Sequence, residues 1–137
     1  MYEVFEHTAD LGLRVRAGTR EELFVDAAKG LSEMIVENLD EVNPQVERSF
    51  RIAGQDNVYL LFDWLNELLY TFEKEKLVFS RFQVRFTGEA LEATASGEPL
   101  DPTRHRADHE VKAITYHGLI VEQQTDGSWL AEVIVDI

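Results

Sequence analysis

The pattern of hydrophobic and polar residues predicts two amphipathic helices in this chain. Apolar residues recur at helical spacing over 23–35, after Thr19 and Glu22, whose spacing is that of a capping box. A second apolar stripe, with a period of about 3.6 residues, covers 58–72 and follows Asp56, a residue suited to cap a helix. We therefore expect one helix after Thr19 and a second after Asp56.

Elsewhere the hydrophobic period shortens to about two residues, which is typical of half-buried β-strands. It occurs over 2–6, 11–17, 46–53, 78–86, 91–96, 111–116, 119–123 and 129–137. The segments 111–116 and 119–123 flank His117-Gly118 and form either one bent strand or two. The dipeptide Asp126-Gly127 is typical of a type I′ hairpin turn before the last strand. Residues 97–109 form the one long loop, and such loops are often functional.

The order of these elements predicts an α+β fold: two strands, a helix, a strand, a helix, and then four or five strands. We expect a two-layer sandwich in which both helices pack on one face of a mainly antiparallel sheet. The length of 137 residues suits a single domain spanning 1–137, because a domain of this size buries enough surface to fold without disulfides or metals.

The charge of the chain is strongly negative, with 26 Asp and Glu against 13 Lys and Arg and a formal net charge of −13. Such a surface repels phosphate backbones, so no direct nucleic-acid binding is expected. A role in RNA chemistry would then pass through a partner protein. The simpler interpretation is that the acidic surplus keeps the protein soluble.

Several classes of protein are excluded by what the sequence lacks. It contains no cysteine, which excludes disulfides, thiolate metal sites and cysteine nucleophiles. It also lacks the glycine-rich motifs of P-loop and dinucleotide-binding proteins and the G-x-S-x-G motif of hydrolases. No signal peptide and no segment of the roughly 20 apolar residues needed for a membrane span is evident, so we expect a cytoplasmic protein with no membrane partner.

Asp136 is the first candidate for chemistry, because it is the penultimate residue of a β-branched terminal run. Its carboxylate lies within one residue of the terminal carboxylate of Ile137, and two anions this close repel unless a cation lies between them. Hard divalent cations such as Mg²⁺ or Ca²⁺ prefer such oxygen ligands. If 111–123 is one continuous strand, pairing across the turn places Asp136 opposite His117. Otherwise Asp136 is a solvated strand end.

Asp10, Lys112 and four histidines are the other candidates. Asp10 lies at a strand edge and suits either a metal site or an ordinary turn. Lys112 lies among apolar and aromatic residues, from which it either approaches a phosphate or acidic cluster or extends along the surface into water. The histidines show no recognised ligand spacing, so each is a ligand, an acid–base group or an ordinary structural residue. They are His7, His105, His109 and His117.

Three motifs at the start, middle and end of the chain resemble the archease family. They are His7-Thr8-Ala9-Asp10-Leu11-Gly12-Leu13, Glu110-Val111-Lys112-Ala113-Ile114-Thr115-Tyr116-His117 and Val135-Asp136-Ile137. The loop 97–105 and the helical segment Leu68-Leu69-Tyr70 are also similar to that family. The resemblance covers essentially the whole chain, and the joint occurrence of the three motifs makes it specific.

This resemblance implies an accessory protein of tRNA splicing with a compact α+β fold. Archeases activate the RNA ligase that joins a 3′-phosphate or 2′,3′-cyclic phosphate to a 5′-hydroxyl, by promoting guanylylation of the ligase and hence its repeated turnover. By the same resemblance, Asp10, Asp136 and an oxygen of Ile137 would hold a divalent cation, either Ca²⁺ or Mg²⁺/Mn²⁺. Lys112 would be the essential lysine of the family.

Under this interpretation the protein is an activator without catalysis of its own, and its partner is the tRNA-splicing RNA ligase. Whether His7, His105 or His117 stands beside the cation is left open by the sequence. Two alternatives remain. A metal-dependent hydrolase would use the same carboxylates to activate water, although no general base or nucleophile pair is evident. A chaperone-like module for another RNA enzyme, such as an RNA methyltransferase, would depend on exposed apolar surface rather than on Asp136.

Overall fold

The computed structural model describes residues 1–7 and 10–137, so Thr8 and Ala9 of the first motif lie outside the described residues. Within the described chain the elements are β1 (Tyr2–His7), β2 (Asp10–Ala17), α1 (Arg20–Ile35), a short 3-10 helix (Leu39–Glu41), β3 (Val46–Ala53), α2 (Asn57–Glu75), β4 (Leu77–Phe86), β5 (Ala90–Pro99), β6 (Ala113–Gln123) and β7 (Trp129–Asp136). Every predicted helix and strand segment falls on one of these elements, with small differences at the boundaries.

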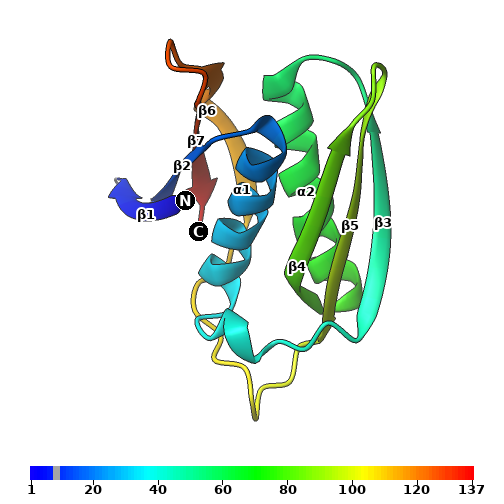
Figure 1. Cartoon of the computed structure of the whole chain (residues 1–137). Coiled ribbons are helices and arrows are strands. Elements are labelled where there is room, and N and C mark those ends of the chain that lie inside the picture. The colour runs from blue at the N-terminus through cyan, green and yellow to red at the C-terminus, as the bar shows by residue number, and fades with distance from the viewer. Residues whose placement is uncertain (8–9) are drawn as a thin grey trace.

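The strands form two antiparallel sheets, and the two helices lie between them (Figure 1). The strand order is β1-β2-β7-β6 in the four-stranded sheet and β3-β5-β4 in the three-stranded sheet. Helix α1 packs against β2 on one side and β4 on the other, and α2 packs against β6 and β3. The α+β class, with two helices packed on antiparallel strands, is therefore confirmed. The structure differs from the expectation in dividing the strands between two sheets instead of one.

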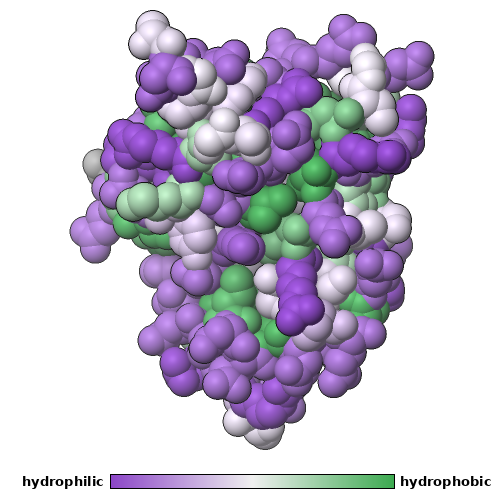
Figure 2. All heavy atoms as spheres, in the orientation of Figure 1, coloured by the Kyte–Doolittle hydropathy of each residue, from purple (hydrophilic) through white to green (hydrophobic). Residues whose placement is uncertain are grey.

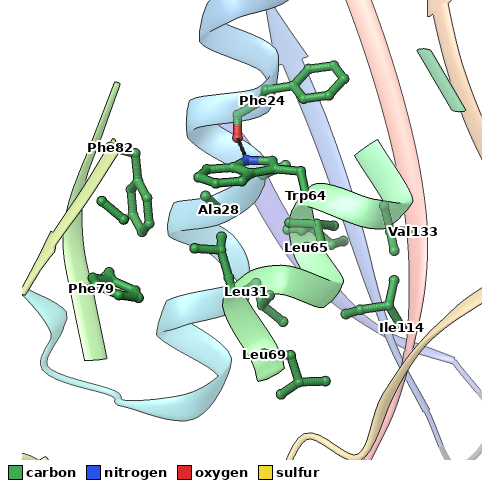
Figure 3. Close-up of a cluster of buried hydrophobic side chains, with 14 of the residues drawn as sticks. Phe24, Ala28, Leu31, Trp64, Leu65, Leu69, Phe79, Phe82, Ile114 and Val133 are labelled. Carbon is green, nitrogen blue, oxygen red and sulfur yellow. Dashed lines mark hydrogen bonds between the residues drawn. The ribbon is translucent and has the colours of Figure 1, made fainter. Parts of the chain in front are cut away.

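This division follows from the breadth of the apolar surface on the helices. Phe79 and Phe82 of β4 cover the helix pair on one side, while Ile114 of β6 and Val133 of β7 cover it on the other (Figure 3). A helix that is apolar on more than one side needs a cover on each side. The hydrophobic period reveals the stripe on each helix, but it does not reveal which strands cover which side.

Trp64 occupies the middle of this core and links the two helices. Its side chain is fully buried, and its indole Nε1 donates a 3.1 Å hydrogen bond to the main-chain oxygen of Phe24 in α1 (Figure 3). The rings of Phe50 and Phe82 meet the indole edge-on, with centroids at 5.4 and 6.2 Å. Because the one polar atom of the indole is satisfied, Trp64 contributes its full apolar surface to the core without leaving a buried donor unpaired.

The helix ends form as the sequence predicts. Thr19 Oγ1 accepts a 3.1 Å hydrogen bond from the N–H of Glu22, and Asp56 Oδ1 accepts a 2.9 Å hydrogen bond from the N–H of Val58. Both N-caps are confirmed. Helix α2 continues through the charged residues beyond its apolar stripe to Glu75, and its C-cap residue Lys76 adopts a left-handed conformation with φ 57°.

The segments on either side of His117-Gly118 form one strand, β6, but its pairing with β7 is irregular. The register shifts between Thr115 and Ile120, which marks a bulge. As a result Asp136 pairs with Ala113, and the expected pairing of Asp136 with His117 is wrong. The alternation rule assumes an unbroken ladder, and the extra residues in the bulge change the partner of every residue beyond it.

The turn between β6 and β7 also differs from the type I′ turn that the sequence predicts. A type I′ turn requires positive φ at both central residues, whereas here Gly127 has φ 90° and Asp126 does not have a positive φ. Gly127 N–H donates to the oxygen of Gln124 at 3.0 Å, and Gln124 N–H donates to the oxygen of Ser128 at 2.7 Å. The loop therefore has three residues, with Gly127 in its left-handed position, and it shifts the strand register by one further residue.

The surface is largely polar, as the net charge of −13 leads one to expect. Figure 2 shows hydrophilic side chains over most of the face seen in Figure 1, with hydrophobic residues between them. Large hydrophobic side chains are exposed at only five positions of the described chain, which are Met1, Val4, Tyr59, Tyr70 and Tyr116. No helix in 1–7 or 10–137 is long and apolar enough to cross a membrane.

Candidate functional site

The structure brings the first residue of β2 and the last residue of β7 side by side. Asp10 and Asp136 are direct partners in the antiparallel pairing of these strands. Directly opposed residues project from the same face of a sheet, and their Cα atoms lie about 4.5–5.5 Å apart. Their neighbours Leu11 and Val135 are buried on the helix side. The two carboxylates therefore project together from the outer face of the four-stranded sheet.

This carboxylate pair carries negative charge without a nearby strong cation. Among the described residues, no Lys or Arg nitrogen lies within 4.0 Å of Asp10 or Asp136. Two unit charges 4 Å apart repel by about 1 kcal/mol even in water, and by more near a protein surface. Such a pair is stabilised by any cation that binds between the two side chains, which is the electrostatic requirement for a divalent ion.

His7 lies beside the pair and has a free ring nitrogen. It is the register partner of Asp10, and its Nδ1 lies 4.0 Å from Asp10 Oδ2, which is too long for a hydrogen bond. Nδ1 is buried and has no hydrogen-bond partner in the described chain. The ring of His117 lies 6.1 Å from that of His7, centroid to centroid. His117 therefore reaches this region next to His7 and not opposite Asp136.

Lys112 joins the same region through its main chain. It directly precedes β6, and its N–H donates a 2.8 Å hydrogen bond to the main-chain oxygen of Asp136. Its side chain is exposed, and Lys112 lines a groove of about 520 Å³ together with Asn66 and Tyr70 of α2. The strand that we expected to begin at residue 111 begins at Ala113, so Lys112 sits at the strand entrance, where its side chain is free to extend toward a ligand.

Ile137 is held against the protein. Its side chain is half-buried and packs against the hydrophobic core, although β7 itself ends at Asp136. This contact ties down the residue that directly follows Asp136. The fold thus brings Asp10 and Asp136 together, while Met1 lies at the other end of β2, beside Arg16.

His105 lies outside this region. It is 3% exposed, and its Nδ1 accepts a 2.9 Å hydrogen bond from the N–H of Asp101, while its Nε2 lies 3.8 Å from Glu98 Oε2. The loop that carries it is fixed to the end of α1, where Asn38 bonds the main chain of Arg104 and Arg106 at 2.9 and 2.7 Å. The long loop that we singled out as a functional candidate thus contains a buried polar cluster of its own.

Glu98 is the centre of that cluster, although it was not among the candidate residues named from the sequence. It is 4% exposed and accepts hydrogen bonds from the N–H of Asn43 and from the guanidinium of Arg104. Burial alone disfavours the charged carboxylate, but these two donors outweigh it and lower the pKa of Glu98 below its usual value. The importance of this glutamate is visible only from its contacts with Asn43 and Arg104, which form when the chain folds.

The side chains at the strand ends are of the type that hard cations bind, but they are few. No three His, Cys, Asp or Glu side chains in the described part of the chain are grouped as a metal site. The structure offers two carboxylates in register and the unpartnered Nδ1 of His7 nearby. Hard cations take main-chain and water oxygens as well as carboxylates, so Ile137 is the residue that would have to complete the set.

Comparison with known proteins identifies the relatives of this chain. The model of the Archease protein family matches residues 2–137. The sequence is 44% identical to Protein archease of Methanopyrus kandleri, over 99% of both chains. It is 40% identical to Protein archease of Pyrococcus furiosus, over 99% of this chain and 98% of that one.

Two solved structures are similar to the structure of this chain. The solution structure of Protein 1598 from Methanobacterium thermoautotrophicum superposes with a TM-score of 0.84 at 35% identity, covering 99% of this chain and 98% of the other. The crystal structure of an archease from Thermotoga maritima, described as a possible chaperone, gives 0.69 at 22% identity, covering 100% and 98%. The second likeness concerns the fold alone.

Proposed function

The chain belongs to the archease family, and on that premise we propose that it activates a tRNA-splicing RNA ligase by promoting guanylylation of the ligase and its repeated turnover. The ligase joins a 3′-phosphate or 2′,3′-cyclic phosphate end to a 5′-hydroxyl. In this role the chain performs no catalysis of its own. The register pairing of Asp10 with Asp136 is the observation that carries the proposal.

In the proposal, Asp10 and Asp136 hold a divalent cation, Ca²⁺ or Mg²⁺/Mn²⁺, together with an oxygen of Ile137. When bound, such an ion supplies positive charge that stabilises the phosphoryl oxygens of a nucleoside triphosphate. The uncompensated charge of the two carboxylates and the fixed position of Ile137 support this assignment. His7 is placed to orient one carboxylate or to contribute a nitrogen.

Lys112 is the residue that acts on the triphosphate in this proposal. Its ammonium is exposed at the rim of the region, and its main chain is tied to Asp136. A lysine presents a compact charge on a flexible stem, which suits contact with phosphate oxygens that belong to a partner. The negative net charge favours docking on a basic RNA-binding enzyme, because complementary potentials speed encounter. The chain itself needs no contact with RNA.

The test is ligation turnover by the cognate ligase with and without this protein, under chelator and after add-back of Mg²⁺, Mn²⁺ or Ca²⁺. We expect stimulation that chelator removes and metal restores, and that is lost in Asp10→Asn and Lys112→Ala. Asp40→Asn is the matched control, because Asp40 is an exposed carboxylate on the short 3-10 helix. Full stimulation by the two site variants would overturn the proposal.

The alternatives are distinguished in the same assay. Turnover of nucleotides or RNA ends by the isolated protein, without ligase, would favour a metal-dependent hydrolase. Stabilisation of another RNA enzyme, such as an RNA methyltransferase, with no requirement for Asp136, would favour a chaperone-like module. Either result replaces the activator mechanism.

A further inference from the structure

The exposed aromatic residues of this protein are concentrated on one surface. Tyr59 and Tyr70 of α2 and Tyr116 of β6 are 58, 55 and 49% exposed. They make up three of the five exposed large hydrophobic side chains in the described chain. Aromatic side chains are enriched in protein interfaces and rare on surfaces that contact only water. We call the area formed by these three tyrosines and Phe62 the tyrosine face.

Three of the four rings of the tyrosine face pack against one another. The ring of Tyr116 stacks on Phe62 with centroids 3.8 Å apart and an angle of 17° between the planes. Tyr59 meets Tyr116 edge-on at 5.8 Å. On α2 the positions 59, 62, 66 and 70 follow helical spacing and form one stripe. Rings that are held in place before binding lose little conformational entropy when a partner docks.

The tyrosine face lies among negative charges. The carboxylates that accompany it on α2 and at its N-cap are Asp56, Asp63, Glu67 and Glu73. Burial and the charge of Asp63 raise the pKa of the Tyr116 phenol above its usual value, so the ring stays neutral at physiological pH. The chain's own Lys74 ammonium lies 5.7 Å from the ring centroid of Tyr70. Cation–π contact is therefore already present at this surface.

A surface that combines exposed aromatic rings with carboxylates fits arginine and lysine side chains. Arg stacks on an aromatic ring and pairs with a carboxylate through separate parts of the guanidinium, and lysine does the same with less directionality. The outer face of β3-β5-β4 differs, because there Arg51 and Arg85 already pair with Glu92 and no large hydrophobic side chain of these three described strands is exposed.

The tyrosine face continues into the candidate site. The groove of about 520 Å³ that runs along α2 is lined by Asn66, Glu67 and Tyr70 on one side and by Lys112 on the other. Lys112 N–H in turn contacts the main-chain oxygen of Asp136. A protein seated on the tyrosine face would therefore reach Lys112 and the β6 edge of the sheet, next to the main chain of Asp136.

We propose that the tyrosine face, with the acidic residues of α2, is the docking surface for the ligase, and that it binds arginine and lysine side chains of that enzyme. This inference rests on the proposed function, because it names the surface by which the activator reaches its partner. Docking and activation are separate in this arrangement. The tyrosine face determines how tightly the partner is held, and the strand ends determine what the bound complex does.

The test is to titrate the protein into multiple-turnover ligation and to measure its direct binding to the purified ligase without RNA. For Tyr59→Ala/Tyr70→Ala we expect the half-maximal concentration and the dissociation constant to rise by at least about tenfold. At saturating concentration, this double variant should stimulate ligation to the same maximal rate as the wild-type protein. Tyr59→Phe/Tyr70→Phe keeps both rings and should stay close to wild type. The matched control is Val4→Ala, an exposed apolar side chain on β1.

The charge of the partner is tested by salt. Added salt should raise the wild-type dissociation constant, and this dependence should weaken in Asp63→Asn/Glu67→Gln but persist in Asp40→Asn.

A wild-type half-maximal concentration in the double tyrosine variant would overturn the docking proposal while leaving the proposed function intact. An effect seen only when RNA is present would also overturn it, in favour of RNA contact. If the wild-type protein binds the ligase but does not stimulate ligation, the proposed function is refuted. If it neither binds nor stimulates the ligase, the docking proposal and the proposed function are both refuted.

Discussion

Two polar clusters in this protein differ in whether the chain supplies a counter-charge for their carboxylates. The cluster around Glu98 satisfies its carboxylate with Asn43 N–H and the Arg104 guanidinium, and it is buried beneath the loop that follows β5. The pair Asp10–Asp136 sits at the ends of the two central strands of its sheet, where no Lys or Arg of the described chain lies within 4.0 Å. The first cluster has its counter-charge within the chain, and the second does not.

The difference separates a structural role from a binding role. A buried carboxylate without partners costs several kcal/mol, so the Glu98 cluster persists only because it is paired. Two half-buried carboxylates that still reach solvent cost less, and a chain can retain them for a ligand that supplies the missing charge. Charge pairing, more than charge itself, therefore distinguishes the residues that hold this fold together from those that we propose to bind a cation.

The largest expected effect breaks the Glu98 cluster. Glu98→Ala leaves the Arg104 guanidinium and the Asn43 N–H without their acceptor and opens a buried space. We expect the free energy of unfolding to fall by about 2–3 kcal/mol, because hydrogen-bond donors lose their acceptor and a buried side chain is deleted, while the Arg104 guanidinium can still reach water. Chemical denaturation followed by circular dichroism measures this. Glu92→Ala, which removes a surface glutamate on the same strand, should cost less than about 1 kcal/mol. Equal losses for the two variants would contradict the distinction.

The next effect concerns the strand-end pair and appears in activity. Asp136→Asn should reduce stimulation of the ligase by about 100-fold, since even residues that only support a metal ligand are often worth 10–100-fold. Its free energy of unfolding in chelator should change by less than about 1 kcal/mol, because the substitution removes repulsion and no ion pair. Ligation turnover and denaturation on one preparation measure both. A large loss of stability would assign Asp136 a structural role instead.

The pH dependence of stability sharpens the comparison. The pKa of Glu98 is lower in the folded protein than its usual value of about 4.3. The stability due to its charge is therefore complete above about pH 5 and is lost as the pH falls through the folded pKa. Wild type should lose more stability than Glu98→Gln between about pH 5 and pH 3. Parallel curves from acid titration of the two proteins would show that the charge of Glu98 contributes nothing.

The smallest expected effect is at the bulge of β6. Gly118 has φ 65°, and a Cβ added there would meet no atom within 4 Å. Gly118→Ala should therefore cost only the backbone strain of a left-handed residue, about 1–2 kcal/mol, with activation retained. Gly88→Ala is the matched control, because Gly88 is equally open but does not have a positive φ, and it should be close to neutral. Thermal denaturation measures both, and a loss of activation in Gly118→Ala alone would give the bulge a role in the site.

Local patterns predicted the helices and their caps correctly because the relevant interactions lie within a few residues. Thr19 with Glu22 and Asp56 with Val58 are contacts of this kind. The register of the last hairpin was predicted wrongly because it depends on a bulge and on a three-residue turn. Neither feature changes the alternation of apolar residues in a way that a sequence alone displays.

The candidate site was predictable in part. The unusual place of Asp136, together with the three motifs, indicated which residues belong together, and the pairing of Asp10 with Asp136 shows that the fold brings them side by side. The position of His105 was not predictable, because its contacts with Glu98 and Asp101 form only when the loop closes. The tyrosine face was also missed, because the exposure of Tyr70 depends on which side of α2 the sheets leave open.

The order of the helices and strands, the helix caps, the negative charge and the candidate residues at both ends were determined by the amino-acid sequence, since each depends on composition or on neighbours along the chain. The division into two sheets, the partner of Asp136 and the burial of Glu98 were decided only by tertiary structure. The physical reason is that these features arise from contacts between segments far apart in sequence, where several arrangements bury similar apolar surface and only the packed whole selects one.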